Sequence, residues 1–143
     1  MTETDIPRRS VGAVTILVPD YQEAIDYFVA TLGFTLIEDT RLSEEKRWVL
    51  VSPGAGTCLL LAKAKGERQI SAIGNQSGGR VFLFLATDNF WRDYRTYVNR
   101  GVGFQQEPRH EEYGMVAVFA DKYGNRWDLI ERASSQGDAR ERA

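Results

Sequence analysis

One acidic residue stands among apolar neighbours near the end of the sequence: Asp128, in the segment Arg126-Trp-Asp-Leu-Ile-Glu131. Strands disfavour aspartate, and burying a carboxylate without a partner destabilises a fold. We therefore expect the Asp128 carboxylate to have a specific role. A lone carboxylate can bind a cation, accept hydrogen bonds from a ligand, or transfer a proton. The alternative interpretation is structural, with Asp128 bonded to a neighbouring backbone group or to Arg126.

The only histidine, His110, lies in the charged run from Arg109 to Tyr113. An imidazole side chain can act as a general acid or a general base. The simplest interpretation of this run is a solvated loop. The functional interpretation is a rim over a cleft, with Asp128 and His110 as the catalytic residues if the protein is an enzyme. Together with Glu107 or Glu112, His110 would also suit an irregular metal site.

The segments around these residues occur twice in the chain. Gly124 lies 68 residues after Gly56, and Asp88 lies 68 residues after Asp20. Each of the two aspartates follows an apolar, β-branched segment and precedes a segment with helical periodicity. Self-similarity at a fixed spacing predicts a module that is present twice.

Each module is predicted to have the order β-α-β-β-β. In the first module we expect a helix capped by Asp20 and ended by Gly33. The predicted strands and helix of this module cover 11–18, 21–32, 34–40, 47–51 and 57–62. Those of the second module cover 80–87, 88–101, 102–107, 114–120 and 126–131. The predicted organisation is one α+β domain with a lead-in over 1–10, modules over 11–62 and 80–131, a connector over 63–79 and a flexible tail over 132–143.

Composition restricts the class of protein. The apolar fraction of 43% and the charged fraction of 27% are typical of a soluble globular domain. A net charge of −2 supplies no basic field, which argues against a nucleic-acid partner. No apolar run has the length of a membrane span or a signal peptide, so we expect a cytoplasmic protein without a membrane partner. The single Cys58 excludes an internal disulfide and a cysteine zinc cluster.

Three motifs carry a resemblance to a known family: Val18-Pro-Asp20, the segment from Ala24 through Leu32-Gly-Phe34, and Asp121-Lys-Tyr-Gly-Asn-Arg-Trp-Asp-Leu-Ile-Glu131. With two β-α-β-β-β modules, they make the chain similar to the vicinal-oxygen-chelate superfamily. That superfamily contains glyoxalase I, extradiol dioxygenases, fosfomycin-resistance enzymes and bleomycin-resistance proteins. The resemblance covers 11–131. It implies that the two modules form an open, cleft-lined β-barrel and that the protein is a homodimer.

Metal-dependent members of this superfamily hold a divalent ion with four side chains, two from each module. The resemblance places the four positions at Ala13, Leu60, Val81 and Asp128. Only Asp128 can coordinate a metal, and one carboxylate does not hold a divalent ion tightly. We therefore predict no metal and no cofactor, and we do not expect the metal-dependent glyoxalase or dioxygenase reactions.

Strand alternation predicts which side chains face the cleft. They are mostly apolar, as in small-molecule sites. The predicted ligand-binding residues are Ala13, Thr15, Trp48, Leu50, Leu60, Val81, Leu83 and Asp128. The favoured function is metal-independent binding of a small hydrophobic, aromatic or cationic molecule, of the sequestration or resistance type. The alternative is a lyase, isomerase or dioxygenase-type enzyme that uses Asp128 and His110, with or without a non-standard divalent metal site.

Overall fold

The computed structural model of the protein describes residues 5–133. The first unit contains β1 (Ala13–Val18), α1 (Tyr21–Asp26), the π-helix η2 (Tyr27–Thr31), β2 (Thr35–Arg41), β3 (Arg47–Ser52) and β4 (Cys58–Lys63). Helix α2 (Gly66–Ala72) follows. The second unit contains β5 (Val81–Ala86), α3 (Phe90–Asn99), β6 (Gly103–Phe104), β7 (Arg109–Glu111), β8 (Gly114–Ala120) and β9 (Arg126–Arg132). The predicted α+β class is confirmed.

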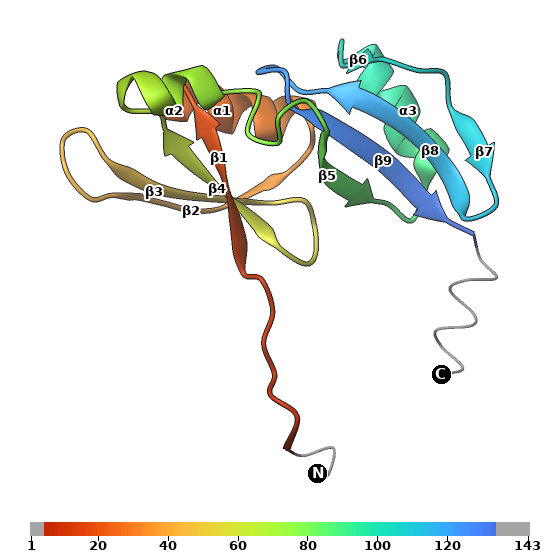
Figure 1. Ribbon diagram of the computed structural model, residues 1–143, viewed down its shortest axis with the longest axis horizontal. Coiled ribbons are helices and arrows are strands. Elements are labelled where there is room, and N and C mark those ends of the chain that lie inside the picture. Colours follow the sequence, from red (N-terminus) through yellow and green to blue (C-terminus); the bar gives the residue numbers. More distant parts are fainter. Residues whose placement is uncertain (1–4, 134–143) are drawn as a thin grey trace.

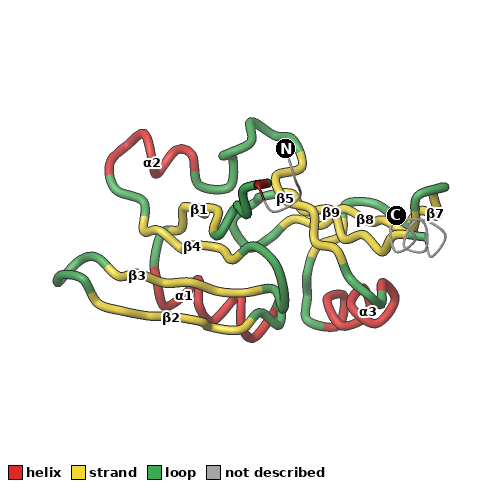
Figure 2. The backbone as a smooth tube through the Cα atoms, turned by 90° about the horizontal axis from the view of Figure 1, so that it is seen from below, coloured by secondary structure: helices red, strands yellow, loops and turns green. Residues whose placement is uncertain are grey.

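The strands form two mixed sheets that lie side by side along the long axis of the molecule (Figure 1). Sheet A has the order β1-β4-β3-β2, and sheet B has the order β5-β9-β8-β6 with β7 also paired to β8. Helices α1 and α3 lie on the same side of the molecule, whereas α2 lies on the other side (Figure 2). Within residues 5–133 no strand of sheet A pairs with a strand of sheet B. The structure thus shows no closed barrel, and the open barrel stays a prediction.

The pairings of sheet B repeat those of sheet A with the spacing of 68 residues that the sequence shows. Leu50 pairs with Leu60 in sheet A, and Val118 pairs with Asp128 in sheet B. The first parallel pair follows the same spacing, since Ala13 pairs with Cys58 and Val81 pairs with Arg126, but beyond Val81 the pairs of β5 are displaced by one residue. Asp128 therefore has the place in sheet B that Leu60 has in sheet A.

Alternate residues of both sheets pack against the helices and form one continuous core. In sheet A the buried set is Ile16, Val18, Val49, Val51, Leu59 and Leu61. In sheet B the corresponding set is Ala117, Phe119, Trp127 and Leu129. The rings of Phe28 and Trp127 lie 6.3 Å apart and join the two halves. The hydroxyl of Tyr97 donates a 2.7 Å hydrogen bond to the carbonyl of Leu32, which satisfies a polar group inside this core.

Helix ends and turns follow the predicted chemistry in most places. The side chain of Asp20 accepts a hydrogen bond from the backbone N–H of Glu23 and caps α1. Gly33 has a φ of 75°, the left-handed conformation expected after a helix. Helix α3 is capped by Asn89, so the predicted start of this helix at Asp88 is wrong by two residues. The Asn89 side chain reaches the free N–H of Arg92, which explains the later start.

Several local predictions in the second half are wrong. The predicted strand 102–107 is reduced to β6, and part of the charged run is strand β7 rather than a solvated loop. Residues 109–111 form a strand because their backbone pairs with the edge of β8. The hydrogen bonds of this pairing join backbone groups, so charged side chains do not prevent them. Strand β9 extends to Arg132, one residue into the predicted tail. The rest of that tail, and the first four residues of the lead-in, lie outside the described residues.

The connector contains a helix and a contact that its sequence did not predict. Helix α2 occupies its first half, and Gln76 follows near the edge of β1. The backbone N–H of Leu17 donates to Gln76 Oε1 at 2.8 Å, and Gln76 Nε2 donates to the carbonyl of Thr15 at 3.1 Å. One glutamine side chain thus pairs with an edge strand as a neighbouring strand would, and it blunts that edge against other chains. In the part of the chain described, no helix is long and apolar enough to cross a bilayer.

Candidate functional site

Asp128 lies in the middle of sheet B, between two apolar neighbours. Its cross-strand partners are Phe84 on β5 and Val118 on β8. Val118 is buried but is not part of the core against α3, which places it and Asp128 on the other face of the sheet. We call this surface the Asp128 face. It contains Phe84, Val116, Val118, Asp128 and Ile130.

The carboxylate of Asp128 lacks a hydrogen-bond partner at one of its oxygen atoms. Its Oδ1 atom is buried and has no hydrogen-bond partner. Arg126, the structural partner considered from the sequence, instead donates to the side chain of Gln105 and to the carbonyl of Gly79. Burial raises the pKa of Asp128, and the positive charge of Arg109 partly opposes this shift. A group in this state is suited to accept a donor or a cation from a ligand.

Asp128→Asn is expected to leave the free energy of unfolding at pH 7 unchanged or raise it by up to about 1 kcal/mol, a small gain because water screens a half-buried carboxylate. A carboxyl whose pKa is raised in the folded state disfavours folding when it is ionised, and the penalty disappears once the pH falls below the unfolded-state pKa. The advantage of the variant should therefore shrink as the pH is lowered towards about 4. Urea unfolding at several pH values measures this.

Asp39→Asn is the matched control, because a hydrogen bond from Arg47 lowers the pKa of Asp39. That carboxylate favours folding above its unfolded-state pKa, so its variant should lose stability at pH 7 and recover relative to the wild type in acid. A loss of more than about 1 kcal/mol in Asp128→Asn at pH 7 would mean that Asp128 serves the fold.

The structure does not bring Asp128 and His110 together. His110 pairs with Met115, whose side chain packs against the core on the α3 side of sheet B. Successive residues of a strand point to opposite faces, so His110 and Asp128 lie on different faces of the same sheet. The predicted catalytic pair is not assembled in this chain. The sequence analysis treated residues 109–113 as a loop. It therefore did not predict that β7 pairs with β8 and that this pairing fixes the face on which His110 lies.

Arg109, and not His110, is the residue of β7 that shares a face of sheet B with Asp128. It pairs with Val116, and Val116 shares its face of β8 with Val118. Arg109 therefore lies on the Asp128 face, and its guanidinium is also ion-paired with Glu111 at 3.2 Å. The sequence analysis missed this residue, because a register between β7 and β8 is needed to assign its face.

The predicted residues of the first module share one surface. Ala13, Thr15, Trp48, Leu50 and Leu60 all alternate with the buried residues of sheet A. They therefore lie on the face of that sheet that α1 does not cover, and the indole of Trp48 is 39% exposed there. Their role in binding a ligand stays a prediction.

The residues of β5 are divided between two surfaces. An irregularity between Val81 and Leu83 shifts the register, so that Leu83 pairs with Trp127 while Val81 pairs with Arg126. Leu83 therefore lies on the α3 side, and the prediction that it shares a face with Asp128 is wrong. Because side chains alternate along a strand, one extra residue on β5 moves the following side chains to the other face. Phe84, which the sequence analysis did not select, takes the position beside Asp128.

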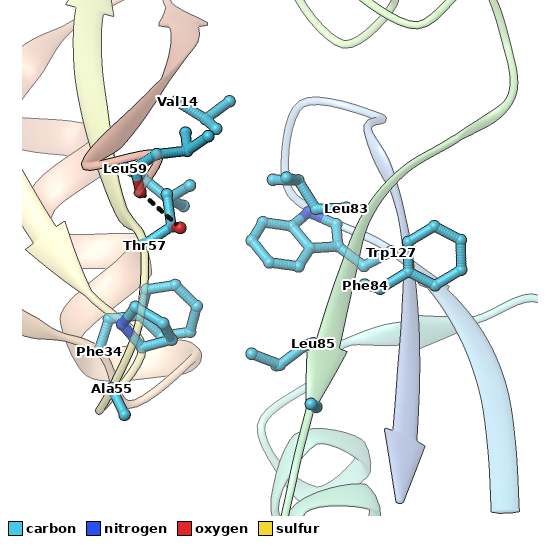
Figure 3. Close-up of a pocket in the computed structure, with 12 residues that line it drawn as sticks. Val14, Phe34, Ala55, Thr57, Leu59, Leu83, Phe84, Leu85 and Trp127 are labelled. Carbon is cyan, nitrogen blue, oxygen red and sulfur yellow. Dashed lines mark hydrogen bonds between the residues drawn. The ribbon is translucent and has the colours of Figure 1, made fainter. Parts of the chain in front are cut away.

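An apolar pocket of about 390 Å³ lies between the two units. Figure 3 shows Val14, Phe34 and Leu59 on its first wall. Leu83, Leu85 and Trp127 point towards them from the second unit, and Phe84 points away. The indole N–H of Trp127 is already bonded to Asp121 at 2.9 Å, and the hydroxyl of Thr57 to the carbonyl of Val11 at 2.8 Å. This pocket offers apolar contact, and of the predicted ligand residues it contains only Leu83.

The four positions that would hold a metal in related proteins do not fit one here. Ala13, Leu60 and Val81 carry no donor atoms, and Asp128 is the only carboxylate of the set. Among residues 5–133, no three or more histidine, cysteine, aspartate or glutamate side chains are grouped so that they could hold a metal ion. Glu107 and Glu112 thus form no such group with His110.

Comparison with known proteins identifies the family. The model of the Glyoxalase/Bleomycin resistance protein/Dioxygenase superfamily matches residues 10–129. An uncharacterized protein of Shewanella frigidimarina is 51% identical over 132 residues, which cover 90% of this chain and 98% of that protein.

Solved structures show the same relationship. TnmS3, an antibiotic binding protein from Streptomyces sp. CB03234, is 29% identical with a TM-score of 0.72, over 90% of this chain and 99% of that chain. A member of the same superfamily from Sphaerobacter thermophilus is also 29% identical, with a TM-score of 0.67, over 87% of this chain and 98% of that chain. The chain therefore belongs to the Glyoxalase/Bleomycin resistance protein/Dioxygenase superfamily.

Proposed function

We propose that the protein binds a small aromatic or cationic molecule on the Asp128 face, without a metal ion, and that it acts by sequestration. One observation carries the proposal: Oδ1 of Asp128 is buried without a hydrogen-bond partner, between the apolar cross-strand neighbours Phe84 and Val118. A fold that keeps such a group loses stability unless a ligand supplies the missing donor. The antibiotic-binding function of TnmS3 supports this class of activity.

The neighbours of Asp128 suit such a ligand. Phe84 is 66% exposed, which is unusual for a phenylalanine and leaves its ring free for contact with an aromatic molecule. Val118 provides a buried apolar floor on the other side of the carboxylate. A cation or a hydrogen-bond donor held between these groups would meet Asp128 in a partly dry environment, where electrostatic interactions are stronger than in water.

The enzyme alternative has less support. A general acid–base pair needs both groups within reach of one substrate, and His110 and Asp128 lie on different faces of sheet B. The proposal keeps the predicted homodimer and cytoplasmic location. A second copy would shield exposed apolar side chains outside the Asp128 face, such as Trp48, which is 39% exposed.

Thermal-shift measurements with a panel of aromatic amines, and with divalent metal ions, test this function. We expect selected cationic aromatics to raise the melting temperature, and zinc, manganese or iron(II) to have no effect. Asp128→Asn should weaken binding of the best ligand by about tenfold, which corresponds to the loss of one charge-assisted hydrogen bond. Phe84→Ala should also weaken it.

Ile70→Ala is the control for Phe84→Ala, since Ile70 is 57% exposed on α2, away from sheet B. Native mass spectrometry of the same samples gives the number of chains and any retained metal. Tight stoichiometric metal, or binding that Asp128→Asn does not affect, would refute the proposal.

A further inference from the structure

The Asp128 face carries two opposite charges that are not paired with each other. Arg109 is ion-paired with Glu111 at 3.2 Å, and Asp128 forms no ion pair within residues 5–133. The positive charge of Arg109 nevertheless acts on the carboxyl of Asp128. A guanidinium has five N–H donors, so one carboxylate partner leaves others free for a ligand. The two groups thus present an acceptor and a set of donors on one surface.

The order of these groups across sheet B is set by strand pairing. Phe84 on β5 is followed by Asp128 on β9, then by Val116 and Val118 on β8, and then by Arg109 on β7. Neighbouring strands lie about 4.8 Å apart, so Phe84 adjoins Asp128, whereas Arg109 lies two strands from Asp128, in the row of Val116 and Ile130. The side chains that lie between the two charged groups, Val116 and Val118, are buried, with 0% and 4% exposed.

The opposite charges of Asp128 and Arg109 restrict the class of ligand that can bind the Asp128 face tightly. A simple cation satisfies Asp128 but lies near the positive Arg109, and a simple anion satisfies Arg109 but lies near the negative Asp128. A head group with a hydrogen-bond donor on one side and an acceptor on the other can bind Asp128 and Arg109 at the same time. An aromatic body attached to it would contact Phe84.

We propose that the ligand is an aromatic molecule with a mixed head group, in which an amino or hydroxyl donor binds Asp128 and an adjacent carboxylate or carbonyl oxygen binds Arg109. This inference rests on the proposed binding function and makes it more specific. It assigns to Arg109 a role in selecting the ligand, and it excludes purely cationic aromatics as the preferred class.

Three probes with the same indole ring test the proposal by isothermal titration calorimetry: tryptamine carries only the amine, indole-3-propionate only the carboxylate, and tryptophan both. Tryptophan should bind at least about tenfold more tightly than either of the others. Arg109→Gln should reduce the affinity for tryptophan about tenfold and leave tryptamine within about twofold. Asp128→Asn should weaken tryptamine and tryptophan but not indole-3-propionate.

Two control variants separate recognition from folding. Glu111→Gln removes the ion-pair partner of Arg109 and keeps the guanidinium, so it should retain or increase the affinity for tryptophan. Arg68→Gln changes an exposed arginine on α2 and should change nothing. If Arg109→Gln weakens all three probes together and lowers the melting temperature, Arg109 serves the structure and the inference fails.

The remaining outcomes distinguish this inference from the function on which it rests. Equal binding of tryptamine and tryptophan, without an effect of Arg109→Gln, would overturn the inference and leave a cation-binding protein. Absence of binding for all three probes and for the aromatic amines would overturn both.

Discussion

Asp121→Ala is expected to lower the free energy of unfolding by about 3–5 kcal/mol, because it removes the acceptor of several buried donors at once. Oδ1 of Asp121 accepts from the backbone N–H groups of Tyr123 and Asn125 at 2.9 and 3.0 Å. Oδ2 accepts from the Asn125 side chain at 3.0 Å and from the indole N–H of Trp127 at 2.9 Å. Asp121 and Trp127 are only 5% and 2% exposed, so water cannot replace these bonds.

Urea unfolding followed by tryptophan fluorescence measures this loss. Asp88→Ala is the matched control, since the Asp88 side chain is 86% exposed and its 2.8 Å ion pair with Arg92 joins the residue before the cap of α3 to the first turn of that helix. That variant should lose about 0.5 kcal/mol or less. An Asp121→Ala protein within about 1 kcal/mol of the wild type would show that the turn before β9 does not depend on this carboxylate.

Gly114→Ala is expected to destabilise the protein by about 3 kcal/mol or more, through both backbone strain and a steric clash. Gly114 has a φ of 143°, which residues with a side chain rarely adopt. A Cβ atom at this position would lie 1.9 Å from the carbonyl oxygen of Glu131, so β8 and β9 would have to separate. Gly114 also pairs with Glu111, and the hairpin that presents Arg109 would therefore move with it.

Gly103→Ala provides the comparison within the same sheet. Gly103 pairs with Ala120, has no left-handed φ, and has no atom within 4 Å of the added methyl group. This variant should keep the wild-type stability or gain up to about 1 kcal/mol, because alanine restricts the unfolded chain. Similar unfolding free energies for the two glycine variants would contradict the proposed strain at Gly114.

The repeat shows how much of the fold could be predicted from local sequence. Turn glycines such as Gly56 and Gly124, and the cap Asp20, mark positions where the backbone conformation restricts which residue types fit. Their constant spacing predicted the order of elements in both units, and it also related Asp128 to Leu60 before any pairing was known. Helix caps and turn glycines depend on residues that are close together in the chain, so a single sequence is enough to recognise them.

Register was harder to predict, and it decides the composition of the site. The extra residue on β5 separates Leu83 from Asp128, and no residue type in that strand indicates it. The short pairing of β7 with β8 moves His110 away from Asp128 and places Arg109 on its face. Both depend on backbone hydrogen bonds between segments, which any side chain permits.

The sequence by itself determined the family resemblance, the two-module order, the unsuitability of the usual metal positions, and the selection of Asp128 as the residue to explain. Each of these depends on residue types and spacing along the chain. The tertiary structure alone decided that Oδ1 of Asp128 is buried without a partner, that Phe84 pairs with Asp128, and that Arg109 lies on the same face. Burial and cross-strand contact arise only when strands distant in sequence pair, which is why Asp128 could be found from the sequence and its surroundings could not.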